Sequence, residues 1–296
     1  MNSNIANRLH APARALLLLF TLSLCLISSG SRAQLAKRND RASERLGIKL
    51  SLQCYTFRAL TFFETVDEAA KMGIRYLEIF PGQKIQAGSD DTMNWHMSPA
   101  NITAIKAKLK SAGGLKLIGY GVDGVPTEEV EARKMFDWAK LMGVTVLVTE
   151  TTPTELHDKL CTEYNIRMAL HNHPSSWPPD EVLKATKDRV KLIGSCSDTG
   201  HWMRRNLVPT EQLKKLQGRV EHLHFKDLNQ YGSGEDLPWG TGQGDAKGML
   251  TELKRQGYHG FVSIEYEVGS VADLESNLPK CVSFFDTTLT DLSKSR

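Results

Sequence analysis

Two hydrophobic periods alternate along residues 48–296. Short apolar runs of strand length recur at regular intervals, and each is followed by a stretch whose apolar residues repeat every three or four positions, as on one face of a helix. The predicted strands are 48–55, 75–80, 115–122, 144–149, 166–171, 191–197, 220–225 and 261–266. The predicted helices are 61–72, 98–112, 126–142, 153–164, 180–188, 209–216, 246–256 and 271–292. Residues 34–47 are polar, without an apolar period, and we interpret them as a linker.

Strict alternation of strand and helix predicts an α/β fold with a parallel sheet. Eight such units favour a closed (β/α)8 TIM barrel, formed as one domain by residues 48–296, over a doubly wound open sheet. Polar residues at the carboxyl end of every predicted strand agree with this choice, because barrel active sites are built from those ends. The first strand runs into Gln53-Cys-Tyr-Thr-Phe-Arg58, which contains no glycine. The absence of a Gly-rich phosphate-binding turn argues against a nicotinamide enzyme.

Residues 1–33 have the composition of a secretory signal peptide. Arg8 and Arg14 precede an apolar run at 15–27, and the small residues Ser31 and Ala33 suit cleavage before residue 34. The apolar run is shorter than the ~20 residues that a membrane-spanning helix needs. We therefore expect an exported protein, periplasmic or secreted, without stable membrane insertion after cleavage.

The charge of the chain gives no indication of a polyanion-binding surface. The formal net charge is +3, and residues 1–33 contain three arginines and no acidic residue, so the remaining chain is formally neutral. Nucleic acids are not expected as partners, because phosphate contacts need basic residues. The remaining cysteines match no zinc-ribbon spacing, and we interpret them as buried thiols.

Four predicted strands end in a side chain that can bind a metal: Glu150, Asp198, His224 and Glu265. Side chains alternate along a strand, and each of these residues shares its face with small or apolar residues below it. Three carboxylates and one imidazole suit one divalent ion such as Mn²⁺, Mg²⁺, Co²⁺ or Zn²⁺, and without a cation the carboxylates would repel one another. Each residue alone has an ordinary alternative, since strand-end acids cap helices and strand histidines form core hydrogen bonds.

These residues lie in motifs that resemble the xylose-isomerase-like TIM barrels, the sugar isomerase/epimerase and AP endonuclease family 2 type. The matching pieces are Thr149-Glu150, Ser197-Asp-Thr-Gly-His201, Glu221-His-Leu-His-Phe-Lys-Asp227, Gly240-Thr-Gly-Gln-Gly-Asp245 and Gly260-Phe-Val-Ser-Ile-Glu-Tyr-Glu267. The resemblance spans residues 48–290. It implies that the four residues named above bind one divalent metal, that Glu150 and Glu265 act as the acid/base pair, and that His201 binds a substrate oxygen.

Other polar and aromatic residues near strand ends are candidates for substrate contact. His173, in the segment His171-Asn-His-Pro174, could contact substrate, add a ligand or structure its loop. Lys226 could polarise a carbonyl, and Glu78 could bind a hydroxyl or pair with a cation. Trp239 could stack on a sugar face.

The metal site sets the chemistry without choosing the reaction. A cation that chelates a carbonyl and the adjacent hydroxyl makes the α-proton more acidic by stabilising the enediolate, and a carboxylate can remove that proton. Our first hypothesis is an exported, divalent-metal-dependent sugar isomerase or epimerase that acts on a small sugar or keto-sugar. The alternatives are a 3-keto-glycoside lyase that uses the same site for β-elimination, and a non-catalytic carbohydrate-binding barrel. Association into homo-oligomers stays open.

Overall fold

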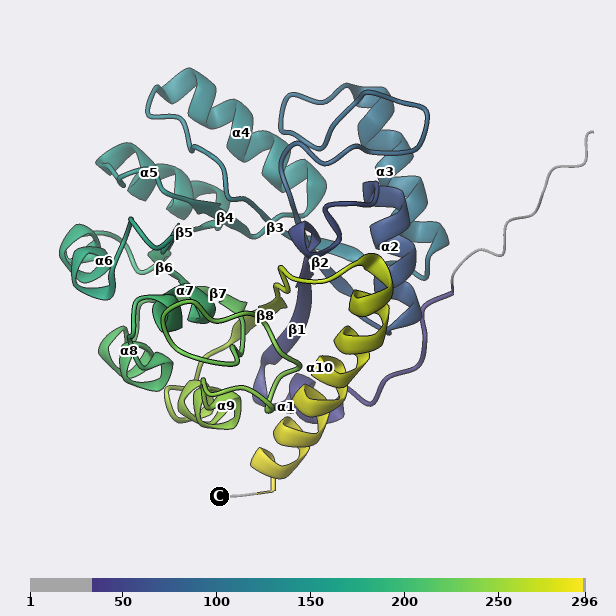
Figure 1. Cartoon of the computed structure of the whole chain (residues 1–296). Helices are drawn as coiled ribbons and strands as arrows, with labels where there is room; N and C mark the ends of the chain where they lie inside the picture. The colour runs from purple at the N-terminus through teal and green to yellow at the C-terminus, as the bar shows by residue number, and fades with distance from the viewer. Residues whose placement is uncertain (1–33, 295–296) are drawn as a thin grey trace, which may run out of the picture. The chain divides into compact units, whose positions relative to one another are not determined.

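The computed structural model describes residues 34–294, which form a closed barrel of eight parallel strands (Figure 1). Each strand pairs with its neighbour in sequence, and β8 closes the barrel on β1. The strands are β1 (Ile48–Gln53), β2 (Tyr76–Ile79), β3 (Lys116–Tyr120), β4 (Val146–Thr149), β5 (Arg167–His171), β6 (Ile193–Asp198), β7 (Val220–Phe225) and β8 (Gly260–Ile264). The predicted (β/α)8 fold is confirmed. The predicted signal peptide lies outside the described residues.

A ring of helices surrounds the barrel (Figure 1). Its members are α2 (Phe62–Lys71), α3 (Pro99–Ser111), α4 (Glu129–Met142), α5 (Glu155–Tyr164), α6 (Pro179–Thr186), α8 (Pro209–Lys215), α9 (Ala246–Arg255) and α10 (Val271–Leu292). Capping residues determine where several of these helices begin. Thr61 and Ser270 form capping boxes at the starts of α2 and α10, and Ser98 caps α3 ahead of a proline in its first turn. No helix within residues 34–294 has the length and hydrophobicity to cross a membrane.

Three short elements were not expected from the hydrophobic pattern. Helix α1 (Arg41–Leu46) lies in the segment predicted to be a linker and packs against α10, so that segment belongs to the fold. A 3₁₀ turn, η1 (Cys54–Phe57), follows β1, and α7 (Thr199–Arg204) follows β6 directly. Asp198 begins α7 by accepting a hydrogen bond from the backbone N–H of His201 at 2.8 Å.

The barrel interior has an apolar side and a polar side. The apolar side chains come from β4, β5 and β6, and they are Val146, Val148, Ala169 and Cys196. The polar side chains come from β1, β2, β7 and β8, and they are Ser51, Glu78, His222 and Ser263, all completely buried. The larger hydrophobic core fills the shell between the strands and the helices. The four cysteines of the described residues are buried and unpaired.

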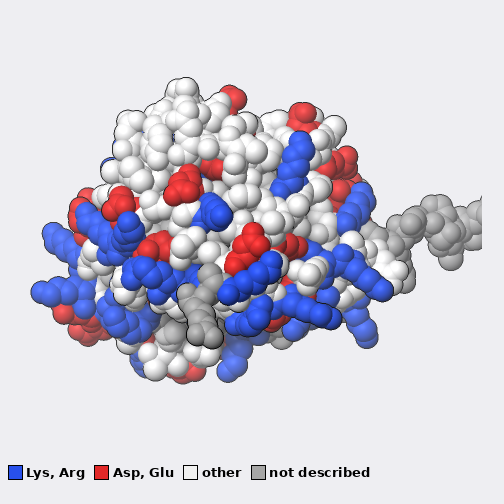
Figure 2. All heavy atoms as spheres, turned by 90° about the horizontal axis from the view of Figure 1, so that it is seen from below, with Lys and Arg blue, Asp and Glu red and all other residues white. Residues whose placement is uncertain are grey.

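Basic residues gather at one end of the molecule. Lys or Arg occupies the last turn of most helices around the barrel, where a positive charge complements the helix dipole, for example Lys108 in α3, Lys140 in α4 and Arg255 in α9. Figure 2 shows lysine and arginine side chains crowded into the lower half of that view, with acidic residues among them. Because the helices run opposite to the strands, this end is the one away from the strand carboxyl ends.

Glu221, on β7, gives the stability of the fold a dependence on pH. Its side chain is 12% exposed and lies 2.9 Å from the guanidinium of Arg167. Burial raises the pKa of Glu221 to about 7, although Arg167 acts in the opposite direction. The folded state therefore holds this proton more tightly than the unfolded state, and the group lowers the free energy of unfolding as pH rises from its ordinary pKa to about 7.

We expect Glu221→Gln to remove this pH dependence. The free energy of unfolding of the variant, relative to that of the wild type, should increase from pH 5 to pH 8. The increase should reach up to about 3 kcal/mol if the whole pKa shift is expressed. Thermal unfolding of both proteins at the two pH values measures the difference. A difference between the two proteins that is the same at both pH values would contradict the assignment.

Candidate active site

A cavity of about 290 Å³ opens at the carboxyl ends of the strands. His171, His173, His201 and Glu265 form part of its polar wall, together with Gln53 and Glu267. Tyr55, Phe80 and Val122 form an apolar wall, in which the rings of Tyr55 and Phe80 meet edge to face at 4.9 Å. A hollow of about 390 Å³ at the opposite end of the barrel, around Lys49 and Arg167, contains none of the predicted site residues.

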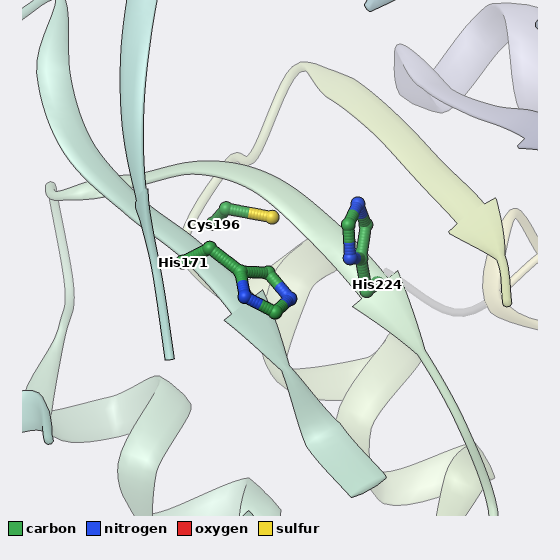
Figure 3. Close-up of side chains that lie close together, drawn as sticks. All are labelled: His171, Cys196 and His224. Carbon is green, nitrogen blue, oxygen red and sulfur yellow. The ribbon is translucent and has the colours of Figure 1, made fainter. Parts of the chain in front are cut away.

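Four buried side chains come together from four strand ends beneath the cavity, and two of them, His171 and Glu265, line it. His171 ends β5, Asp198 ends β6, His224 lies near the end of β7 and Glu265 follows β8. One ligand atom from each lies within 4.8 Å of the others. Figure 3 shows the rings of His171 and His224 close together, and their centroids are 4.8 Å apart. The structure thus brings together three of the four predicted metal ligands and adds His171.

These four side chains fit a divalent cation. Both ring nitrogens of His171 and Nδ1 of His224 are buried, and none has a hydrogen-bond partner within residues 34–294. Burial lowers the pKa of His171, which favours the neutral imidazole that binds metals. Nδ1 of His224 lies 3.2 Å from Oε2 of Glu265. Two imidazoles and two carboxylates are a donor set typical of Zn²⁺, Mn²⁺ and Co²⁺ sites.

Cys196 lies one layer below this cluster, two residues before Asp198 on β6. Figure 3 shows its sulfur directed toward the ring of His224. Burial raises the pKa of the Cys196 thiol to about 12, so the thiol is neutral. His171, Cys196 and His224 also lie close enough to hold an ion together, but the neutral thiol makes them the weaker set for a hard cation.

Glu150, the fourth predicted ligand, lies outside the cluster. Its side chain is 41% exposed, and its Oε1 lies 2.5 Å from Nδ1 of His173 and from the hydroxyl of Ser176. Its backbone carbonyl accepts a hydrogen bond from the indole of Trp177 at 2.9 Å. Burial would raise the pKa of Glu150, but the bonds from Ser176 and His173 outweigh it and lower that pKa. His173 therefore lies between Glu150 and the cavity.

Lys226 is completely buried behind the carboxylates of the cluster. Its Nζ lies 2.7 Å from Oδ2 of Asp198, 2.6 Å from Oε2 of Glu265 and 3.2 Å from Oε1 of Glu267. Burial alone would raise the pKa values of both carboxyl groups, but their charged neighbours outweigh it. Lys226 and His224 lower the pKa of Glu265 to about 2. His201 and Lys226 lower the pKa of Asp198. Lys226 therefore keeps both carboxylates ionised, and the structure does not place it on the cavity wall where it was expected to meet substrate.

His201 stands on the cavity wall, where it was predicted to contact substrate. Its Nδ1 lies 3.2 Å from the guanidinium of Arg204, which can only donate, so Nε2 carries the hydrogen. Nε2 lies 3.5 Å from Oδ2 of Asp198. Burial lowers the pKa of His201 to about 3 despite that neighbour. His201 is therefore a neutral hydrogen-bond donor at physiological pH.

Asp227 explains the glycine-rich motif that follows β7. Its carboxylate accepts hydrogen bonds from the backbone N–H groups of Gly240, Gly242 and Gly244 at 2.8, 3.1 and 2.9 Å. A Cβ on Gly242 would lie 2.4 Å from this carboxylate. The motif therefore shapes a loop and adds no side chain to the cavity wall.

Two predicted substrate contacts, Glu78 and Trp239, lie away from the cavity wall. Glu78 is completely buried beneath the cluster, and Trp239 is 2% exposed with its ring against Phe225 at 4.5 Å. The aromatic side chains on the wall are instead Tyr55 and Phe80, which the sequence analysis did not select. The available signal for both was their position as the last residue of a predicted strand.

The chain is similar to known proteins along most of its length. The family model of the xylose isomerase-like TIM barrel matches residues 66–286. An uncharacterised protein from Parabacteroides distasonis ATCC 8503 has 32% identity and a TM-score of 0.65, over 81% of this chain and 99% of that one. A D-psicose 3-epimerase in the presence of D-fructose has 12% identity and a TM-score of 0.62, over 81% and 99%. The IOLI protein with a binding zinc atom has 17% identity and a TM-score of 0.58, over 82% and 98%. No curated protein matches the chain.

Proposed function

We propose, from the premise that the chain belongs to the xylose isomerase-like TIM barrel family, that it is a divalent-metal-dependent isomerase or epimerase of a small sugar or keto-sugar. The observation that carries the proposal is the buried cluster of His171, Asp198, His224 and Glu265 beneath a sugar-sized cavity, which His171 and Glu265 also line. The similar fold of a D-psicose 3-epimerase and of a zinc-binding protein supports it.

The four cluster residues would hold one divalent cation. Such an ion would polarise the carbonyl oxygen of a keto-sugar and make the neighbouring C–H more acidic. Lys226 keeps Asp198 and Glu265 ionised, and so keeps them able to attract a cation. His201 offers its Nε2–H to a substrate oxygen from the cavity wall.

Two groups stand ready for proton transfer on different sides of the cavity. Glu265 follows β8, and His173 follows β5, three strands away around the barrel. His173 holds its Nδ1 against Glu150, which leaves Nε2 for the substrate. One group can remove a proton from one face of a planar intermediate and the other can return it on the opposite face, which is the requirement for epimerisation. In this proposal Glu150 acts through His173, and the two-carboxylate pair inferred from the resemblance is replaced by Glu265 and His173.

The cavity favours an uncharged substrate. Its wall contains carboxylates and histidines, and none of the residues described by the structure that line it is a lysine or arginine. A sugar phosphate would meet Glu265 and Glu267 without a cationic side chain to bind its phosphate. We therefore propose a non-phosphorylated sugar or keto-sugar as substrate.

The apolar wall favours a second candidate reaction. Tyr55, Phe80 and Val122 lie beside the polar wall and could hold the apolar aglycone of a glycoside while its sugar meets the cluster. The same proton removal would then expel the aglycone from a 3-keto-glycoside by β-elimination.

We also propose that the protein is exported, on the basis of the composition of residues 1–33.

Deuterium incorporation tests the proposed function. The protein is incubated in D₂O with Mn²⁺ and either a ketohexose or a 3-keto-glycoside, and the reaction is followed by NMR. We expect deuterium next to the carbonyl of an otherwise intact sugar, and no incorporation after chelation of the metal. Release of the aglycone would instead support the lyase. Binding of sugars without either reaction would support a carbohydrate-binding barrel and contradict the proposed function.

A further inference from the structure

Glu78 is the centre of a polar network that crosses the barrel from β2 to β7. Its carboxylate is completely buried, and both oxygens bind imidazoles of one strand: Oε2 lies 2.6 Å from Nε2 of His222, and Oε1 lies 2.8 Å from Nε2 of His224. Ser263 on β8 donates a further hydrogen bond to Oε2 at 3.0 Å. The carboxylate is thus held at both oxygens and has a single orientation.

The bond to Glu78 decides which nitrogen of His224 is left for another partner. An ionised carboxylate only accepts hydrogen bonds, so Nε2 of His224 carries the hydrogen and donates it. Nδ1 is then the nitrogen left to bind a cation, on the side where Glu265 lies 3.2 Å away. We propose that Glu78 is a positioning residue, which fixes the orientation and tautomer of His224 so that Nδ1 faces the cation site. This inference rests on the metal site proposed above.

The surrounding strands are shaped to hold this carboxylate. A Cβ on Gly119, in β3, would lie 2.9 Å from Cγ of Glu78, and the register of β2 against β3 shifts between Leu77 and Glu78. The hydroxyl of Ser263, in turn, is hydrogen-bonded to the hydroxyl of Ser51 on β1 at 2.7 Å. The network therefore involves every strand on the polar side of the barrel, and β3 leaves room for it at Gly119.

A positioning role explains why a carboxylate occupies this place. A buried carboxylate is costly unless hydrogen bonds replace its lost hydration. Within residues 34–294, the hydrogen-bond and ion-pair partners of Glu78 are His222, His224 and Ser263, and none of them is a lysine or arginine. Imidazoles that bind metals typically donate their other N–H to such a carboxylate, which orients the ring and makes the free nitrogen more basic.

Binding of Mn²⁺ to the metal-free protein tests this role. Glutamine at position 78 keeps the size of the side chain, but its NH₂ group cannot accept from an imidazole, so one of the two bonds is lost or its ring changes tautomer. We expect Glu78→Gln to weaken Mn²⁺ binding in calorimetry about 10- to 100-fold, with an unchanged circular dichroism spectrum. Equal affinity in the folded variant would overturn the inference and leave the metal site standing. Absence of binding to the wild type would overturn the metal site itself.

A second variant moves Glu78 without removing a polar group, in case Glu78→Gln does not fold. Gly119→Ala places a methyl group against Cγ of Glu78, and we expect about tenfold weaker Mn²⁺ binding as the carboxylate shifts. Gly124→Ala is the matched control, because the atom nearest to its new methyl group is 4.0 Å away, and it should bind like the wild type. Equal affinities of the two alanine variants would contradict the proposal.

The nitrogen used by His224 can be read directly. In the Zn²⁺-loaded wild type, long-range ¹H–¹⁵N spectra of histidine-labelled protein should show that Nε2 of His224 is protonated and that Nδ1 is shifted by the metal. If Glu78 had a purely structural role, Glu78→Gln would lower the stability of the fold. The protonation of Nε2 and the metal shift of Nδ1 of His224 would then be the same as in the wild type. Nδ1 protonated and Nε2 metal-shifted in the wild type would overturn the inference.

Discussion

His171→Ala is expected to abolish stable binding of the divalent metal, while Glu150→Ala is expected to retain about one equivalent per chain. His171 contributes a buried nitrogen within 4.8 Å of the ligand atoms of Asp198, His224 and Glu265, whereas the carboxylate of Glu150 is half exposed and turned toward His173. Loss of a ligand should weaken binding by more than the roughly 10- to 100-fold that is typical of residues behind the ligands. The measurement is metal content per chain after loading with Mn²⁺ or Zn²⁺ and desalting.

The pair of variants separates two ligand sets. If Glu150→Ala loses the metal and His171→Ala keeps it, the set inferred from the resemblance is right and the cluster in the structure is not the cation site. Asp198 belongs to both ligand sets, so Asp198→Ala should lose the metal in either case. A wild type that retains no metal would contradict both sets.

The fold was predictable because it follows from local periodicity. Each strand and helix around the barrel carries its own hydrophobic period, and eight alternating units leave few topologies. Helix α1 was missed because its six residues are too few to show a helical period, and its packing on α10 comes from the far end of the chain. Helix α7 was missed because its start depends on Asp198, which the sequence marked as a ligand and which also caps a helix.

The site was predictable where a residue lies inside a strand, and less so beyond it. Asp198 and His224 lie within their strands, and alternation places them on the inner face. His171 is the last residue of β5 and follows the same rule, whereas Glu150 lies one residue past β4, where the chain turns and alternation no longer applies. Glu265 also follows its strand, but the ammonium of Lys226 holds it over the barrel.

Long-range packing decided the remaining assignments. Nothing in the local sequence of Trp239 shows that its ring is buried against Phe225 and Phe285 from distant segments. Lys226 was chosen because it follows a strand, yet its ammonium is drawn beneath the cavity by carboxylates from two other strand ends. Such contacts join residues that are far apart in the chain, so periodicity carries no information about them.

His173→Ala is expected to lower kcat about 10²- to 10⁴-fold, which is the usual contribution of a positioned acid or base. The reason is geometric: the ring of His173 lines the cavity, and its Nδ1 is bound to Glu150 at 2.5 Å, so Nε2 is the nitrogen available to substrate. The metal content should stay near that of the wild type, because His173 lies outside the four-residue cluster. The measurement is kcat and KM for the substrate identified by deuterium incorporation, together with metal content.

Glu150→Gln then tests whether Glu150 acts through His173. An amide can donate to Nδ1 and thereby favour the opposite tautomer, so kcat should fall at least about tenfold with little change in KM, as expected when a base is left in the wrong tautomer. Ser176→Ala is the matched control, because it removes the other hydrogen bond to Oε1 of Glu150 and leaves the imidazole bond in place. If His173→Ala raised only KM, the residue would be a substrate contact. If Glu150→Gln and Ser176→Ala behaved alike, the carboxylate would serve the loop after β5, and Glu265 would be the single proton-transfer group that the geometry supports.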